Sequence, residues 1–339
     1  MNPRNLNSIF SSIRNLKIGV LGDFALDFYY DLERETGEIS IETGKEVFHG
    51  SSPRPIPGGA GTIVNNLSAL AVQDIYCFGL IGKDIFGREL RYQLKNRGAD
   101  LSGIIEVDEA WDSYVYTKAY TKSVEGNRVD FGSQNSIHPH DFQKICRLLE
   151  ELLPDLDVLI INQQFKSGIT APNRLIVLKE LLQKFPKCLV ISDLRDSTGA
   201  LGHGLIKGNL SEIKRILPLP ANNLELDPME MAKKVYSKTG LPILMTLGEK
   251  GMIYVDEEQN HKIAGIPLEG PLDITGAGDA CLSAFATCMG IKIPIAQAIY
   301  IANLAAAVSV QKLQETGSAS PEEISALALQ HPLPSAQKS

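Results

Sequence analysis

Short apolar runs alternate with longer amphipathic segments along most of the chain. The apolar runs begin near residues 17, 75, 158, 188 and 243 and have the length of buried strands. Two of the segments between them, 84–98 and 173–185, carry apolar residues at helical spacing. Strands that alternate with helices in this way predict parallel strands joined by crossover helices. We therefore expect an α/β fold with a central, mostly parallel sheet flanked by helices.

Two regions break this alternation. Residues 28–56 and 111–122 have polar-alternating strand patterns with no helix between the strands. We interpret them as a small separate β-sheet, a lid that closes over substrate and excludes water. An edge extension of the main sheet fits the same pattern equally well. Residues 246–255 predict a hairpin that turns at 248–251.

The length and composition are those of an ordinary globular protein. The chain has 339 residues, of which 44% are hydrophobic and 22% charged. We expect one domain over 15–330, with 1–14 and 331–339 as flexible termini. The formal net charge of -7 argues against a surface built for nucleic acid.

Neither a membrane segment nor a metal-binding cysteine pattern is evident. The apolar run at 293–310 is interrupted by Pro294, Gln297 and Asn303 and falls short of the ~20 residues that a membrane span requires. The first fifteen residues lack the apolar core of a signal peptide. The five cysteines form no Cys-x-x-Cys pair, and we expect Cys281 and Cys288 to be core residues. A cytoplasmic protein is the expectation.

A run of small residues followed by a carboxylate stands at the start of a predicted helix, in DITGAGDACLSAF at 273–285. The first N–H groups of a helix have no partner inside it, and the helix dipole adds positive charge there. The small residues Gly276, Ala277 and Gly278 would let an anion approach those amides. Asp279 stands beside that place, which suits a base that accepts a proton from a hydroxyl. We expect the dipole to keep Asp279 ionised at neutral pH.

The same stretch also fits an ordinary helix start, and three rival motifs point to different functions. An acidic residue that complements the helix dipole accounts for Asp279 about equally well. The dinucleotide fingerprint fails because Cys281 occupies its sixth position, and no P-loop occurs in the chain. The triplet at 130–132 matches the Asp-Phe-Gly of protein kinases, but their other motifs are missing.

The chain resembles the ribokinase (PfkB) family of sugar kinases over about residues 16–327. The late signature of that family, Asp-Thr-x-Gly-Ala-Gly-Asp, reads Asp-Ile-Thr-Gly-Ala-Gly-Asp at 273–279, and the early Gly-Gly signature reads Pro-Gly-Gly-Ala-Gly at 57–61. The resemblance implies a ribokinase-like fold, ATP and Mg²⁺ as cofactors, and phosphoryl transfer to a sugar hydroxyl. It also allows a monovalent cation near residue 273, which no residue pattern here requires.

In that family the last Asp of the late signature activates the acceptor hydroxyl, and the amides before it stabilise the transferred phosphoryl group. These roles fall on Asp279 and on residues 276–278. The Asn-x-x-Glu motif of the family matches Asn209 and Glu212, which implies that Glu212 binds Mg²⁺ through water and Asn209 faces the phosphates. The same spacing is also a common helix-capping pattern.

The resemblance also places the nucleotide. Lys207 matches a lysine that contacts phosphate in some members, although a solvated surface lysine accounts for it equally well. The base is expected between a turn and a helix, and the residues implied there are Thr246, Gly248, Gly251 and Asn303. An Asn among alanines and valines needs partners, which neighbouring backbone could also supply.

On the sugar side, GDFALD at 22–27 matches the end of the first strand of the family, whose second Asp binds sugar hydroxyls. Asp27 is thereby implied as a sugar ligand, since a carboxylate accepts several hydrogen bonds. We expect Asp23 to be a turn or capping residue. Gly58 and Gly59 would give the substrate close access to backbone.

Within the family the chain is similar to the heptose-phosphate kinases, mainly in 273–279, 302–307 and 312–321. Two departures leave the sugar open. Thr62 replaces a sugar-binding Asn, while Asn65 and Asn66 follow one turn later, and the lid segment 38–45 differs. A phosphate already on the sugar could bind in the lid, or these residues could form a solvated face: Arg34, Lys45, His49 and Arg54.

The leading hypothesis is an ATP-dependent kinase that acts on a sugar or sugar phosphate. A sugar- or nucleotide-binding regulator that kept the fold and lost the chemistry, or a nucleoside or vitamin kinase, are the alternatives. We also predict a homodimer through apolar lid positions, which are Phe28, Tyr29, Ile39, Ile41, Val47 and Phe48.

Overall fold

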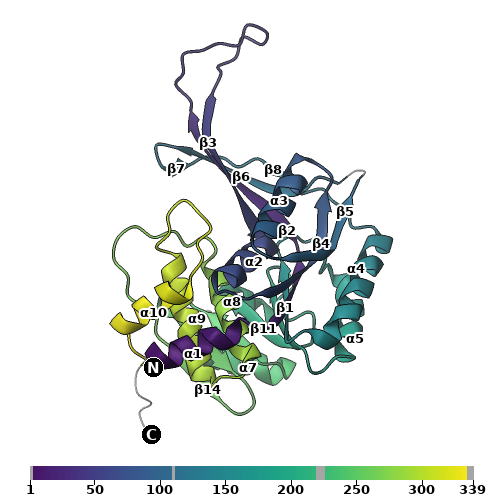
Figure 1. The fold of residues 1–339 in the computed structure, drawn as a ribbon, viewed down its shortest axis with the longest axis vertical. Helices are drawn as coiled ribbons and strands as arrows, with labels where there is room; N and C mark the ends of the chain where they lie inside the picture. Colours follow the sequence, from purple (N-terminus) through teal and green to yellow (C-terminus); the bar gives the residue numbers. More distant parts are fainter. Residues whose placement is uncertain (1–2, 109–110, 219–225, 334–339) are drawn as a thin grey trace.

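The structure is a computed structural model that describes residues 3–108, 111–218 and 226–333. Nine strands of these residues form one sheet (Figure 1). In spatial order they are β14 (Asn260–Ile263), β13 (Met252–Val255), β12 (Ile243–Thr246), β11 (Leu205–Asn209), β10 (Leu189–Leu194), β9 (Val158–Gln163), β1 (Lys17–Gly22), β4 (Asp74–Gly82) and β5 (Asp100–Val107). Every neighbouring pair is parallel except β12 with β13 and β13 with β14. The predicted parallel α/β sheet and the hairpin at 246–255 are confirmed.

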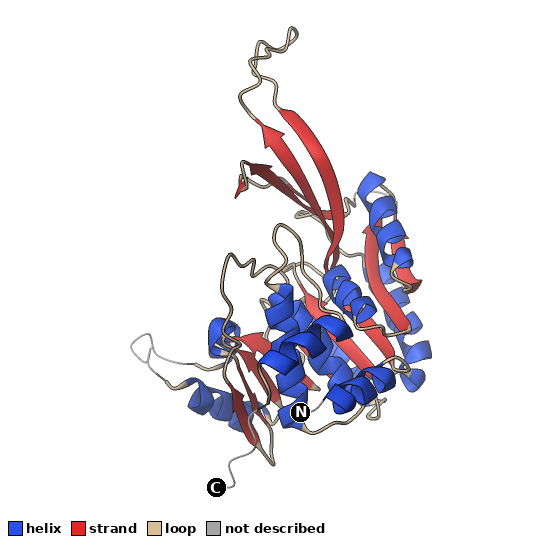
Figure 2. Cartoon of the chain, turned by 60° about the vertical axis from the view of Figure 1, so that its left-hand side comes forward, coloured by secondary structure: helices blue, strands red, loops and turns tan. Residues whose placement is uncertain are grey.

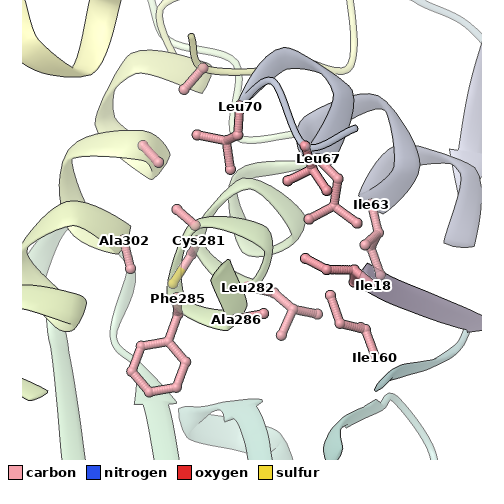
Figure 3. Packing of buried hydrophobic residues seen from close by; sticks show 14 of the residues in the cluster. Ile18, Ile63, Leu67, Leu70, Ile160, Cys281, Leu282, Phe285, Ala286 and Ala302 are labelled. Atoms are coloured by element: carbon pink, nitrogen blue, oxygen red, sulfur yellow. The ribbon is translucent and has the colours of Figure 1, made fainter. Parts of the chain in front are cut away.

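Helices cover both faces of this sheet. One layer consists of α1 (Pro3–Ile13), α2 (Ala60–Ala69), α3 (Ile85–Asn96), α8 (Ala277–Gly290), α9 (Ile295–Ser309) and α10 (Pro321–Gln330). The other consists of α4 (Pro139–Leu152), α5 (Pro172–Gln183), α6 (Leu210–Ile216) and α7 (Pro228–Thr239). Figure 3 shows how Ile18 and Ile160 of the sheet pack against α2 and α8. The strands are continuous apolar runs because successive side chains enter opposite layers.

The lid regions form a second sheet, as predicted. Its strands are β3 (His49–Gly59), β2 (Phe24–Glu33), β6 (Tyr114–Thr121) and β7 (Val124–Glu125), and β8 (Asp130–Phe131) also pairs with β6. Figure 2 shows the long strands of this sheet rising out of the main body. Only Asp23 separates β1 from β2, so the chain passes directly from the large sheet into the small one. The alternative of an edge extension of the main sheet is therefore wrong.

The N-terminal segment is a packed helix rather than the expected flexible terminus. Leu6 and Ile13 of α1 are 1% and 0% exposed, and they join the core beside α8 and α10. Apolar residues at 6, 9, 10 and 13 share one helix face, and burying that face stabilises the helix. At the other end, the carbonyl of His331 accepts a hydrogen bond from Tyr300 and Leu333 packs on the core. Residues 1–2 and 334–339 lie outside the described part.

The expectation that Cys281 and Cys288 are core residues is confirmed. Cys281 and Cys288 are buried and unbonded to other cysteines, and burial raises the pKa of each thiol to about 12. The apolar run at 293–310 folds as α9, and no helix in the described ranges is long and apolar enough to cross a membrane.

Candidate active site

The Gly-Ala-Gly-Asp stretch begins helix α8. Gly276 is the N-cap residue, has a left-handed φ of 79° and makes no side-chain cap. The N–H of Ala277 donates to the carbonyl of Ile274 (3.2 Å), so the expectation that all three amides are bare is wrong for this residue. Within the described part of the chain, the N–H groups of Gly276 and Gly278 have no hydrogen-bond partner. Residues 276–278, here called the anion loop, thus present two free donors at a helix N-terminus.

Asp279 is half-buried in the first turn of α8. Burial raises its pKa from 3.8 to about 7, which outweighs the opposing effect of the Lys207 ammonium. The expectation that the helix dipole keeps this carboxylate ionised is therefore wrong, because desolvation is the larger effect. A pKa near neutral pH is the value that suits a general base.

Lys207 of β11 forms a buried ion pair beside the anion loop. Its Nζ lies 2.6 Å from Oδ2 of Asp193, the penultimate residue of β10, and the lysine is 5% exposed. Burial alone would lower the pKa of Lys207, but the carboxylates of Asp193 and Asp279 raise it above its usual value. A Cβ built on Gly278 would lie 3.1 Å from this Nζ. The alternative of a solvated surface lysine is wrong, and the ammonium adds positive charge at the anion loop.

Asn209 and Glu212 form a capping box at the start of α6. The side chain of Asn209 accepts from the Glu212 N–H, and Oε2 of Glu212 accepts from the Asn209 N–H at 2.8 Å. The helix-capping interpretation of this motif is thus confirmed. The other carboxylate oxygen of Glu212 has no hydrogen bond within the described residues, so capping does not exclude metal binding through water.

The residues implied for the nucleotide base lie close together. Gly248 and Gly251 have φ values of 61° and 91° in the turn between β12 and β13. A Cβ on Gly251 would collide with the backbone at 263–265, and Asn303 of α9 donates to the carbonyl of Ala264 at 2.8 Å. Thr246 ends β12 next to this turn. In this structure neighbouring backbone therefore satisfies the buried Asn303 amide.

Asp27 is buried in β2 within a polar cluster. Oδ2 of its carboxylate accepts from the Thr316 hydroxyl at 3.0 Å and lies 3.4 Å from Nζ of Lys118. A Cβ on Gly58 would lie 3.0 Å from Asp27 Oδ1, so this glycine leaves space beside the second carboxylate oxygen. Sequence reasoning assigned no role to Lys118 or Thr316, although Thr316 lies in the stretch 312–321 that resembles the heptose-phosphate kinases.

The other residues implied for the sugar differ in accessibility. Gly59 has a φ of 58°, and a Cβ there would collide with the Asp23 carbonyl, so the chain's own backbone requires this glycine. Thr62 is buried and donates to the carbonyl of Pro57, while Asn66 is 1% exposed and donates to the carbonyl of Thr62. The Asn66 amide therefore makes its hydrogen bond within helix α2, and Asn66 is not part of the proposed sugar site.

Asp23 takes the structural role expected of it. Its carboxylate accepts three backbone N–H bonds, from Gln164, Phe165 and Ile169, at 2.9–3.0 Å. Burial nevertheless raises its pKa above the usual value. These bonds fix the loop after β9 at the point where the chain leaves β1 for β2.

Asp193, Lys207, Asn209 and Thr246 lie at or near the carboxyl ends of the neighbouring strands β10, β11 and β12, the edge at which α/β folds bind ligands. The sequence pattern of the pfkB family carbohydrate kinases matches residues 16–323. The chain belongs to this family of carbohydrate kinases.

Individual proteins agree with this assignment. The bifunctional protein HldE of Shewanella sp. (strain ANA-3) is 30% identical over 316 residues, which are 93% of this chain and 64% of that protein. The chain thus spans less than two thirds of the length of this relative. Among solved structures, phosphofructokinase-2 from Escherichia coli in complex with potassium has a TM-score of 0.75, at 16% identity over 93% of this chain and 99% of that one. Arabidopsis thaliana ribokinase complexed with ribose and ATP has a TM-score of 0.69, at 18% identity over 92% and 98%.

Proposed function

We propose that this carbohydrate kinase transfers the γ-phosphoryl group of ATP to a hydroxyl of a sugar phosphate. The observation that carries the proposal is the position of Asp279, a carboxyl with a pKa of about 7 that directly follows two free amides and lies near the Lys207 ammonium. A base matched to neutral pH beside an anion site is what phosphoryl transfer to an alcohol requires.

The proposed reaction begins with the sugar hydroxyl near Asp279. The hydroxyl oxygen forms a bond to the γ-phosphorus, its proton passes to the Asp279 carboxylate, and the bond from that phosphorus to the β-phosphate oxygen breaks. Charge that develops on the transferred group is stabilised by the N–H groups of Gly276 and Gly278 and by Lys207. ADP and the phosphorylated sugar are the products.

ATP and Mg²⁺ fit the residues present. No group of three or more His, Cys, Asp or Glu side chains able to hold a metal occurs in the described ranges. Mg²⁺ usually binds through substrate phosphates, water and one or two carboxylates, so a complete protein cage is not needed. The Glu212 carboxylate would hold Mg²⁺ through water, and the bound cation would neutralise charge on the phosphates. The turn at 246–251 and α9 would hold the nucleotide, and Arabidopsis ribokinase was solved with ATP.

Two arginines are candidates to bind a phosphate that the acceptor already carries. Arg195, which follows β10, interacts electrostatically with Asp279 and with Tyr116 of the small sheet. The Arg128 guanidinium lies 4.6 Å from the centre of the same Tyr116 ring. Of the lid groups considered from the sequence, His49 and Arg54 pair with Glu38 and Asp31. Arg128 is likewise paired with Asp130, at 2.8 Å, whereas no ion pair involves Arg195 within the described residues. Arg195 is therefore the better candidate for a second phosphate, in keeping with the resemblance to heptose-phosphate kinases.

The experiment is ADP release from Mg-ATP across free sugars, sugar phosphates and nucleosides. A sugar phosphate should give the highest kcat/KM. Arg195→Gln should raise KM for that substrate and leave KM for the matching free sugar unchanged. Preference for a free sugar or a nucleoside would contradict the acceptor class. Saturable binding without ADP release would favour the regulator, which has no use for a base at Asp279.

A further inference from the structure

Four buried polar side chains join the small sheet to the loop before α10. Asp27 and Tyr29 come from β2, Lys118 from β6, and Thr316 from the loop. The Tyr29 hydroxyl accepts from Lys118 Nζ at 2.9 Å and lies 3.3 Å from the Thr316 hydroxyl. Both Thr316 and Lys118 contact Oδ2 of Asp27. Each member has at least two partners in the cluster, so a movement of the Asp27 carboxylate is passed on to the Thr316 hydroxyl.

The other side of Thr316 faces the anion loop. A Cβ built on Gly276 would lie 2.6 Å from the Thr316 methyl group, so this methyl group packs directly on the N-cap of α8. The preceding loop is tied to the same stretch, since Asp273 N–H donates to the carbonyl of Val310 and Gln314 N–H donates to the Asp273 carboxylate. One threonine therefore touches the proposed sugar ligand with its hydroxyl and the anion loop with its methyl group.

We propose that Thr316 is a positioning residue that couples acceptor binding at Asp27 to the geometry of the anion loop. This inference rests on the proposed function, in which Asp27 binds the sugar. Within the described residues no hydrogen bond reaches Oδ1 of Asp27, which faces the space at Gly58. A sugar hydroxyl bound at Oδ1 turns the rigid carboxylate, and Oδ2 moves the Thr316 hydroxyl with it. The methyl group transmits that movement to Gly276, whose backbone directs the free N–H groups.

The test is calorimetric binding of Mg-adenylyl-imidodiphosphate, a non-hydrolysable ATP analogue, with and without the best sugar phosphate of the panel at saturation. In the wild type the acceptor should tighten nucleotide binding by about fivefold or more. Thr316→Val keeps the shape and removes the hydroxyl, whereas Thr316→Ser keeps the hydroxyl and removes the methyl group. Each variant should bring the ratio of the two affinities to within about twofold of one and leave the affinity without acceptor unchanged. Glu315→Gln, an exposed neighbour, should keep the wild-type ratio.

The outcomes separate this inference from simpler roles. If Thr316→Val weakens acceptor binding but keeps the ratio, Thr316 only anchors Asp27 and the coupling is disproved. If only Thr316→Ser changes the ratio, the residue only packs against Gly276, and the coupling is again disproved. The coupling is also overturned if the acceptor changes the affinity of the wild type for the ATP analogue by less than twofold. A wild type that releases no ADP with any acceptor contradicts the proposed function itself, whereas an active wild type with unaltered variants contradicts only the coupling.

Discussion

The ammonium of Lys207 lies 2.6 Å from Oδ2 of Asp193, and both side chains are buried beside the anion loop. Lys207 also lowers the pKa of Asp279, which burial raises. One ion pair thus contributes both to the stability of the sheet end and to the ionisation of the proposed base.

Lys207→Met is expected to destabilise the fold and shift the activity profile. The change leaves Asp193 buried and unpaired, which costs about 3–5 kcal/mol in the free energy of unfolding. It also removes the charge that favours ionised Asp279, so the pH at which activity reaches half its maximum should rise. Urea unfolding and pH–rate profiles measure the two effects. Adding Asp193→Leu should recover much of the lost stability, and a single variant as stable as the wild type would contradict the buried pair.

Activity and stability should depend on pH in opposite directions around Asp279. Only the carboxylate accepts a proton, so kcat/KM should rise with pH and level off above the pKa of about 7. The raised pKa means that the folded state binds more protons than the unfolded state between about pH 4 and 7. The stabilising contribution of protonated Asp279 is therefore present below about pH 4 and lost as the pH rises to 7.

The measurement for stability is the free energy of unfolding of the wild type minus that of Asp279→Asn at several pH values. This difference should fall as the pH rises from about 4 to about 7, because only the wild type loses the protonated carboxyl. If this difference rises over the range, or if kcat/KM stays constant from pH 5 to 8, the pKa of Asp279 does not lie near 7.

Glu212→Gln should separate capping from metal binding. Gln serves at this position of a capping box, so helix α6 and the melting temperature should change little. Loss of the carboxylate should raise the Mg²⁺ concentration for half-maximal activity by about tenfold or more. Glu230→Gln, in the first turn of α7, is the matched control and should leave Mg²⁺ dependence unchanged. Equal Mg²⁺ dependence in Glu212→Gln and wild type would restrict Glu212 to its capping role.

The lid is expected to pair two copies of the chain. Ile39, Ile41 and Phe48 are 53%, 102% and 49% exposed on the arm that follows β2, which projects from the body in Figure 1. Tyr29 does not belong to this surface, contrary to the expectation from the sequence, because it is 1% exposed beneath Lys118. Light scattering should give twice the chain mass of 37.0 kDa.

Substitutions on the arm check where the dimer forms. Ile41→Asp should reduce the mass in solution to that of one chain, whereas Ile176→Asp, at a 64% exposed position on α5, should not. A wild type that stays at 37.0 kDa over a wide concentration range would contradict the dimer.

The parts of the site that sequence reasoning could predict are contiguous in the chain. The anion loop and Asp279 lie in one short stretch, and their helix start follows from local chemistry. The bond between Asp27 and Thr316 joins residues 289 positions apart, and that between Lys118 and Tyr29 spans 89. Such pairs depend on strand pairing in the small sheet and on loop packing, which no local pattern encodes.

The wrong expectations have similar causes. The ionisation of Asp279 was predicted from the helix dipole alone, while its desolvation depends on elements far away in the sequence. Helix α1, in contrast, carried a readable signal, since apolar residues at 6, 9, 10 and 13 have helical spacing. Its polar composition hid that pattern.

The most direct test of the account is the rate of ADP release by Asp279→Asn with saturating Mg-ATP and the best acceptor. The amide keeps the shape of the side chain but cannot accept the proton, so kcat should fall by about 10²–10⁴-fold. The affinity for ADP should stay within a few-fold of wild type, and Glu257→Gln, an exposed change near the sheet edge, should behave as wild type. A kcat for Asp279→Asn within tenfold of wild type would contradict its role as the base.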